Sequence, residues 1–262
     1  MACALVATWW KEPSQSRLFS TVSIHQENNQ RWIDGVVRSG SKTHLIGYAR
    51  SLWHFNGVLF RSEYPMRDLL QDSMEYSSAL HNIHTLTLVN IRVEHIADEG
   101  LHTCFSAFRE TLTFLFLEFC SMSFSAFVNL VDYFPNITTL RLRTFDLEPD
   151  EEPVPTLSRP LRGKLYIKID DLDCSEFFDR LAKLDSEYEG LAFEASISRD
   201  MAATFVDSAL QISASTIKCL RLAIGLEREH SPPLFVKTVS NNTFKLELHQ
   251  QSVTFGNSKN CS

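Results

Sequence analysis

Short hydrophobic segments of one spacing recur along this chain of 262 residues, at intervals of 25 to 29 residues. In each segment two apolar residues alternate with other side chains, the pattern of a β-strand with one buried face. Four segments read apolar-x-x-Leu-x-Leu, at 83–88, 112–117, 137–142 and 217–222, and weaker copies lie at 165–169, 191–193 and 246–248. The repeat anchors are Leu86, Leu115, Leu140, Leu165, Phe193, Leu220 and Leu246. Such regular spacing predicts a repeated structural unit.

Helical patterns separate these strand segments. Residues 96–108, 124–134, 175–184 and 201–212 each place apolar side chains on one helical face. In the second pattern that face consists of Phe124, Phe127, Val128, Val131 and Phe134. Ser175 and Asp200 are expected to begin the last two helices, because their side-chain oxygens can accept an otherwise free backbone N–H.

The recurring order of strand, turn and helix resembles leucine-rich repeats, whose core reads L-x-x-L-x-L-x-x-N/C-x-L. The resemblance implies an α/β solenoid with irregular repeats of about 26 residues, a curved parallel sheet on its concave side and helices on its convex side. At the ninth position, whose side chain bonds turn backbone in the family, Cys120 fits, whereas Ile91, Phe145 and Gly225 do not. These turns should therefore be irregular. The alternative is a generic α/β sheet of parallel strands, which also alternates strands with helices.

One unit differs from the others. Between Phe145 and Gly163 stand four prolines, at 149, 153, 155 and 160, which forbid a regular helix. We expect an extended connector with an acidic, exposed start. It is either a partner-binding loop or simply a repeat without a helix.

The first twenty residues carry a second resemblance. Cys3, Leu5, Val6, Trp10, Arg17, Leu18 and Phe19 occupy positions similar to the end of an F-box, where a helix is followed by a short polar turn and then by the first strand of the next domain. The phrases at 19–24, 48–52 and 134–142 also resemble F-box-like proteins of mushroom-forming fungi. Only the final F-box helix can fit before Trp10. The opening that carries most of the adaptor contact is missing, so adaptor binding through Leu5, Val6 and Trp10 is in doubt.

The two resemblances together imply an F-box remnant at 1–19, a leucine-rich-repeat domain at 20–256 and a polar tail at 257–262. A protein of this kind is a non-enzymatic interaction module that presents a protein substrate to a cullin-based (SCF-type) ubiquitin ligase. The alternative is a ligase-independent scaffold with the same repeats and a vestigial F-box. The substrate's identity cannot be read from the sequence, and the chain by itself is expected to be a monomer.

Composition limits the partners and the compartment. The formal net charge of −7 argues against general binding of nucleic acid or anionic membranes. Neither a signal peptide nor an apolar run of about 18 residues is present, so no membrane association is expected. The six cysteines are scattered without a C-x-x-C pair, as in free thiols of a reducing compartment. These features predict an intracellular protein, in the cytoplasm or nucleus.

Motifs that suggest enzymes are weak. Residues 35–43 come one residue from a P-loop, but Ser41 separates Gly40 from Lys42. The segment before it is expected to be a helix and the segment after it a strand, which is the reverse of the order in a P-loop. His81 with His84, Glu227 with His230, and the aspartates at 170, 171 and 173 are better explained as solvated polar groups or helix caps. No nucleophile, base and orienting group occur together, so neither an enzyme, a cofactor nor a metal site is expected.

A partner is expected on the concave strand face. Strand neighbours of the buried leucines should point there, and this predicts an exposed set: Thr87, Phe114, Phe116, Glu118, Arg141, Arg143, Lys164, Tyr166, Lys168, Glu194, Arg221, Lys245 and Glu247. We expect the partner to contact Phe114, Phe116, Arg141, Arg143, Lys164, Tyr166, Lys168 and Arg221. Aromatic anchors beside a basic stripe suit a peptide with acidic or phosphorylated groups. The alternative is that the aromatic residues are covered and the charges belong to a solvated sheet face.

Overall fold

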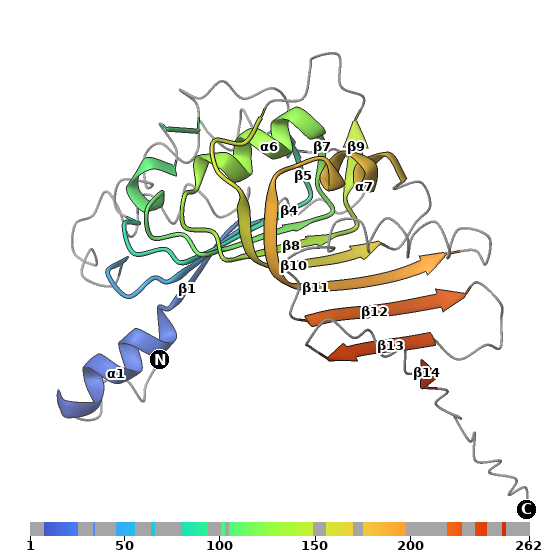
Figure 1. The fold of residues 1–262 in the computed structure, drawn as a ribbon. Helices are drawn as coiled ribbons and strands as arrows, with labels where there is room; N and C mark the ends of the chain where they lie inside the picture. The colour runs from blue at the N-terminus through green and yellow to red at the C-terminus, as the bar shows by residue number, and fades with distance from the viewer. Residues whose placement is uncertain are drawn as a thin grey trace, which may run out of the picture.

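The computed structural model describes residues 8–25, 34, 46–55, 64–65, 80–93, 101–102, 105–148, 156–169, 175–197, 219–226, 234–239 and 248–249. Its main element is a 10-stranded sheet in the order β1-β2-β4-β6-β8-β10-β11-β12-β13-β14 (Figure 1). The strands are β1 (Thr21–His25), β2 (Ser51–Phe55), β4 (Thr85–Val89), β6 (Phe114–Glu118), β8 (Thr139–Arg143), β10 (Leu161–Ile169), β11 (Ser186–Ile197), β12 (Cys219–Leu226), β13 (Leu234–Val239) and β14 (Leu248–His249).

The strands lie side by side in chain order, and every neighbouring pair from β1 to β12 is parallel. The expectation of an α/β fold with a parallel sheet is therefore confirmed. The expectation for residues 246–248 as one more parallel copy is wrong, because β13 pairs antiparallel with β12, and β14 pairs antiparallel with β13. Two short antiparallel strands thus complete the sheet after β12.

The register aligns the predicted hydrophobic pairs into two rows. Leu86, Leu115, Leu140, Leu165, Leu191 and Leu220 are successive register partners, and Leu52 extends this row onto β2. Leu191 therefore belongs in the row where the sequence placed Phe193, and Phe193 lies in the second row beside Ile167. Leu86, Leu115 and Leu165 are fully buried, so these rows form the sheet side of the core.

Aromatic side chains complete the core on the other side of these rows. The helix α6 (Phe124–Tyr133) begins at Ser123, whose side chain accepts a hydrogen bond of 3.1 Å from the Ala126 N–H. All five residues of its predicted apolar face are buried: Phe124, Phe127, Val128, Val131 and Phe134. The helix α7 (Ser175–Ala182) buries Phe177 and Leu181, as expected.

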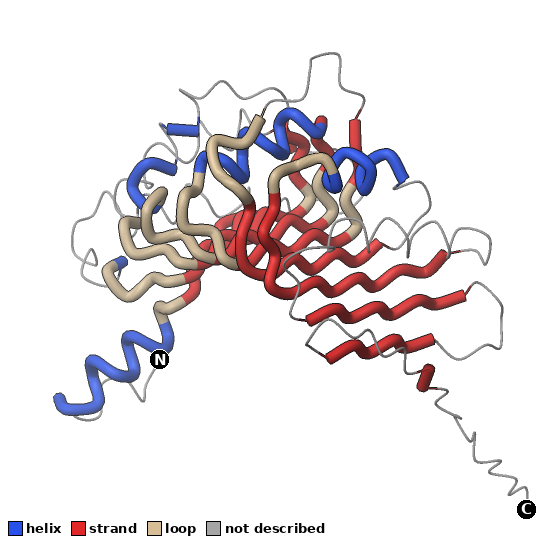
Figure 2. The backbone as a smooth tube through the Cα atoms, viewed as in Figure 1, coloured by secondary structure: helices blue, strands red, loops and turns tan. Residues whose placement is uncertain are grey.

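The predicted helix at 96–108 is helical at 101–102 and 105 and ends in the 3₁₀ helix η3 (Ser106–Phe108). Its buried side chains are Leu101, Phe105 and Phe108. The predicted helix at 201–212 lies outside the described residues. Residues 156–160 of the proline-rich connector are not helical, and 149–155 also lie outside. Figure 2 shows the helices α6 and α7 on the same side of the large sheet, with loops leading to them from the strands.

The turns after β4, β6 and β8 repeat one backbone conformation. Asn90, Phe119 and Thr144 each have a positive φ, between 45° and 56°. The chain then enters a small parallel sheet of β3 (Tyr64–Pro65), β5 (Ile91–Val93), β7 (Ser121–Ser123) and β9 (Asp146–Glu148). Cys120 is buried, and its thiol donates to the carbonyl of Leu88, a residue of β4, at 3.4 Å.

The N-terminal segment differs from its expected form. The helix α1 (Thr8–Leu18) continues through Pro13, where the F-box resemblance predicts a short polar turn. The strand β1 then begins at Thr21, as expected. Leu18 is 54% exposed, so the end of α1 adds little to the core. Among the helices that the structure describes, none has the length and apolarity needed to cross a membrane.

Candidate functional site

One face of the 10-stranded sheet is turned away from α6 and α7, and we call it the open face (Figure 1). Its side chains alternate with the buried leucines along each strand. In the middle of the face, Phe116, Arg141, Tyr166 and Ala192 form one row of register partners, and Phe114, Thr139, Lys164 and Gly190 form the row before it. The row after it consists of Glu118, Arg143, Lys168 and Glu194.

The aromatic residues are placed differently from the expectation. Phe116 is only 9% exposed, and the Arg141 guanidinium lies over its ring, 4.9 Å from the centroid. Thr87, which was expected to be exposed, is buried between its register partners Trp53 and Phe116, whose larger side chains flank it. Phe114 is half-buried. Phe116 therefore supports Arg141 by a cation–π contact and is not a free anchor.

Among the described side chains of this face, the exposed aromatic residues are Tyr166 and Trp53. Tyr166 of β10 is 38% exposed. Its register partner on β11 is Ala192, whose side chain is much smaller. Trp53 is 42% exposed in the same row, one strand beyond Thr87. Trp53 was missed, although its alternation with the buried Leu52 would have indicated it. Phe119, 40% exposed on the turn after β6, was missed because no repeat position marks it.

Four of the predicted cations, Arg141, Arg143, Lys164 and Lys168, do not form one basic stripe. An oxygen of Glu118 lies 2.6 Å from Arg143 Nη1, and an oxygen of Glu194 lies 2.6 Å from Lys168 Nζ. The row after Tyr166 is thus neutral overall. Among the described residues, Arg141 and Lys164 have no carboxylate within ion-pair distance, and both are exposed. Among the described side chains of the open face, the positive charge without an acidic partner is therefore that of these two residues.

The remaining predicted site residues cannot be placed as side chains. Arg221 belongs to β12 and is the register partner of Ala192, but its side chain lies outside the described residues. Trp10 belongs to α1, again without a described side chain. Leu5, Val6, Lys245 and Glu247 lie outside the described residues altogether.

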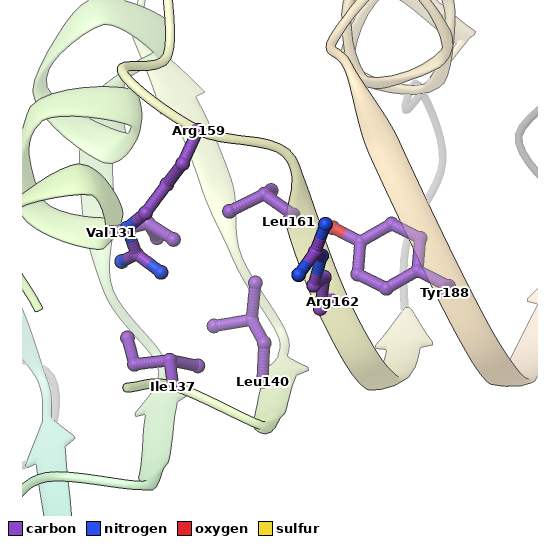
Figure 3. Close-up of a pocket in the computed structure, with 7 residues that line it drawn as sticks. All are labelled: Val131, Ile137, Leu140, Arg159, Leu161, Arg162 and Tyr188. Carbon is purple, nitrogen blue, oxygen red and sulfur yellow. The ribbon is translucent and has the colours of Figure 1, made fainter. Parts of the chain in front are cut away.

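A small cavity lies on the opposite side of the sheet. Its volume is about 10 Å³, room for about one water molecule, and Figure 3 shows Arg159, Arg162 and Tyr188 among its lining residues. Arg159 donates to the carbonyl oxygens of Phe134 and Pro135 at the end of α6. Burial lowers the pKa of Arg159 from its ordinary value, and burial raises the pKa of Tyr188. The cavity is too small for a substrate.

Within the part of the chain that the structure describes, no three His, Cys, Asp or Glu side chains gather closely enough to hold a metal ion. No protein-family model matches the chain. No curated protein matches it either.

Proposed function

We propose that this chain is a non-enzymatic protein-interaction module of the leucine-rich-repeat kind, and that it binds its partner on the open face. The observation that carries the proposal is a cluster of exposed Arg141, Lys164 and Tyr166 on a sheet face opposite the helices. Arginine and tyrosine are enriched among residues that dominate protein interfaces. Parallel strands in chain order and the aligned leucine rows support the solenoid interpretation.

The resemblance of the N-terminus and of later phrases to fungal F-box-like proteins extends this proposal. In that role the open face would be the substrate receptor of a cullin-based ubiquitin ligase, and Leu5, Val6 and Trp10 would be what remains of the adaptor contact. One observation favours the second candidate, a ligase-independent scaffold: α1 continues to Leu18 through the segment where an F-box would turn.

Affinity capture with the full chain tests the open face. Arg141→Glu reverses an exposed charge of the proposed site, and Lys183→Glu reverses an exposed charge just after α7 as a matched control. We expect Arg141→Glu to lower recovery of the captured partner at least tenfold, while Lys183→Glu leaves recovery unchanged. Equal recovery with both variants would refute the proposal.

Co-expression with the ligase adaptor separates the two candidates. The substrate-receptor role predicts that the adaptor copurifies with the chain and is lost when Leu5 and Val6 are replaced by Asp. A partner captured through the open face without any adaptor would establish the scaffold instead.

A further inference from the structure

Arg141 and Lys164, the described cations of the open face without an acidic partner, lie at two corners of a rectangle of neighbouring side chains. In the register of β8 and β10, Thr139 is the partner of Lys164, and Arg141 is the partner of Tyr166. The spacing between strands is about 4.8 Å, and two residues along a strand rise about 6.8 Å, so these four positions form a rectangle with sides of those lengths. The two cations occupy one diagonal, and the two hydroxyl-bearing residues occupy the other. We call Thr139, Arg141, Lys164 and Tyr166 the donor quartet.

The donor quartet is rich in hydrogen-bond donors, and its register neighbours on the adjacent strands carry no negative charge. Its register neighbours on β6 are Phe114 and Phe116, and those on β11 are Gly190 and Ala192, so none of the four is acidic. Two acidic residues in the next row, Glu118 and Glu194, are held by Arg143 and Lys168, and Glu187 on β11 is held by Arg162. An incoming anion therefore meets two cations without displacing an internal carboxylate.

Arg141 is held ready for such an anion. The central carbon of its guanidinium lies 4.9 Å from the centroid of the Phe116 ring, a cation–π contact that restricts the side chain before a partner binds. A planar guanidinium with several N–H donors suits a carboxylate or a phosphoryl group, and a neighbouring lysine adds a mobile point charge. Small residues on β11 leave one side of Tyr166 accessible, so the segment that carries the anion can lie beside its ring.

We propose that the donor quartet binds one phosphorylated side chain in a linear segment of the partner protein. The inference rests on the proposed function, because it names the chemistry that the open face selects. A phosphoryl group carries a charge between about −1.5 and −2 at neutral pH and several acceptor oxygens, so it balances both Arg141 and Lys164. One carboxylate would balance only one of them. The phosphoryl group thus fits the charge of the quartet better than a single carboxylate does.

Three pools of degenerate, fluorescently labelled peptides test the inference with the full chain. The pools are identical except for a central phosphoserine, serine or glutamate, and fluorescence anisotropy measures their affinity. We expect the phosphoserine pool to bind at least about tenfold more tightly than the other two, as charge-assisted hydrogen bonds require. Serine or glutamate pools that bind as tightly as phosphoserine, or a phosphoserine pool that does not bind, would overturn the inference.

A pair of double variants assigns the binding to the quartet. Arg141→Gln with Lys164→Gln should weaken phosphoserine binding at least about tenfold. Arg17→Gln with Lys183→Gln removes the same charge from exposed residues outside the large sheet and should change the affinity less than about threefold. Equal losses in both variants would show a general charge effect and overturn the assignment. Far-UV circular dichroism and the urea midpoint check that both variants are folded.

The inference and the proposed function fail in different ways. If capture of the partner depends on Arg141 but survives treatment of that partner with phosphatase, the proposed function stands and the phosphoryl inference is wrong. If capture does not depend on Arg141 at all, the proposed function itself is wrong. Loss of capture after phosphatase treatment supports both.

Discussion

Replacing Gly163 by alanine should destabilise the protein more than most single changes. Gly163 stands at the irregularity in the pairing of β10 with β11, with φ of +90°. A Cβ atom at this position would lie 2.1 Å from the Thr138 carbonyl oxygen and 2.8 Å from the carbonyl carbon. Both distances are far inside van der Waals contact, and the opposing atoms are backbone, which cannot rotate away.

The cost follows from two effects. A left-handed backbone costs a residue with a Cβ about 1–2 kcal/mol. To relieve the clash, β8 and β10 must separate by about 1 Å, which weakens the hydrogen bond of 2.8 Å from the Lys164 N–H to that same carbonyl. The loss of a bond in this setting costs about 1–3 kcal/mol. We therefore expect Gly163→Ala to lower the free energy of unfolding by about 2–5 kcal/mol, a large part of a typical total of about 5–15 kcal/mol.

Urea unfolding followed by circular dichroism measures the change, and the dependence of free energy on urea should stay the same. Arg162→Ala is the matched control, since it alters the preceding residue and removes an exposed side chain that pairs with Glu187. Its expected cost is below about 1 kcal/mol. If Gly163→Ala costs less than about 1 kcal/mol as well, Gly163 does not hold the conformation and the close approach on which the estimate depends.

Three further changes test the core, the turns and the buried phenol. Phe134→Ala should cost about 3–5 kcal/mol in urea unfolding, because Phe134 is fully buried, whereas Phe119→Ala, on an exposed side chain, should cost far less. Asn90→Thr should lower and Thr144→Asn should raise stability by about 0.5–1 kcal/mol, because asparagine tolerates positive φ better than threonine; two changes of the same sign would contradict this. Burial raises the pKa of Tyr188, so its contribution to stability is complete below a pH of about 10 and is lost as pH rises further, by about 1.4 kcal/mol per pH unit. Tyr188→Phe should make the alkaline loss of stability measurably shallower, and an unchanged slope would contradict the assignment.

The periodic part of the fold could be predicted from the sequence because burial on one face imposes a pattern on each strand. Leu86 and Leu88, like Leu115 and Leu117, are buried as their alternation indicated. Strands are harder to predict where apolar and polar residues do not alternate strictly. The strand β13 was missed, and the sequence could not show that the chain reverses direction after β12. Direction depends on how the connection closes, which local periodicity does not encode.

Exposure on the open face was harder to predict than burial beneath it. Alternation says which way a side chain points, but its exposure depends on the size of its lateral neighbours. Thr87 is buried because Trp53 and Phe116 are its register partners, and Phe116 is covered because Arg141 lies over it. These partners are known only once the register is known, and a shift by two residues would exchange them all.

The register also explains why Arg143 and Lys168 are paired with acidic residues, whereas Arg141 and Lys164 have no such partner among the described residues. In a parallel sheet built with a nearly constant interval, residues about one interval apart in sequence are lateral neighbours. Glu118 and Arg143 are 25 residues apart, and Lys168 and Glu194 are 26 apart, so each acidic residue meets its cation across one strand boundary. The interval of 25 to 29 residues was visible in the sequence, and charges compared at that spacing would have indicated both pairs. Net charge along such a sheet therefore has to be counted across repeats, and among the side chains that the structure describes this leaves Arg141 and Lys164 as exposed cations of the open face without an acidic partner.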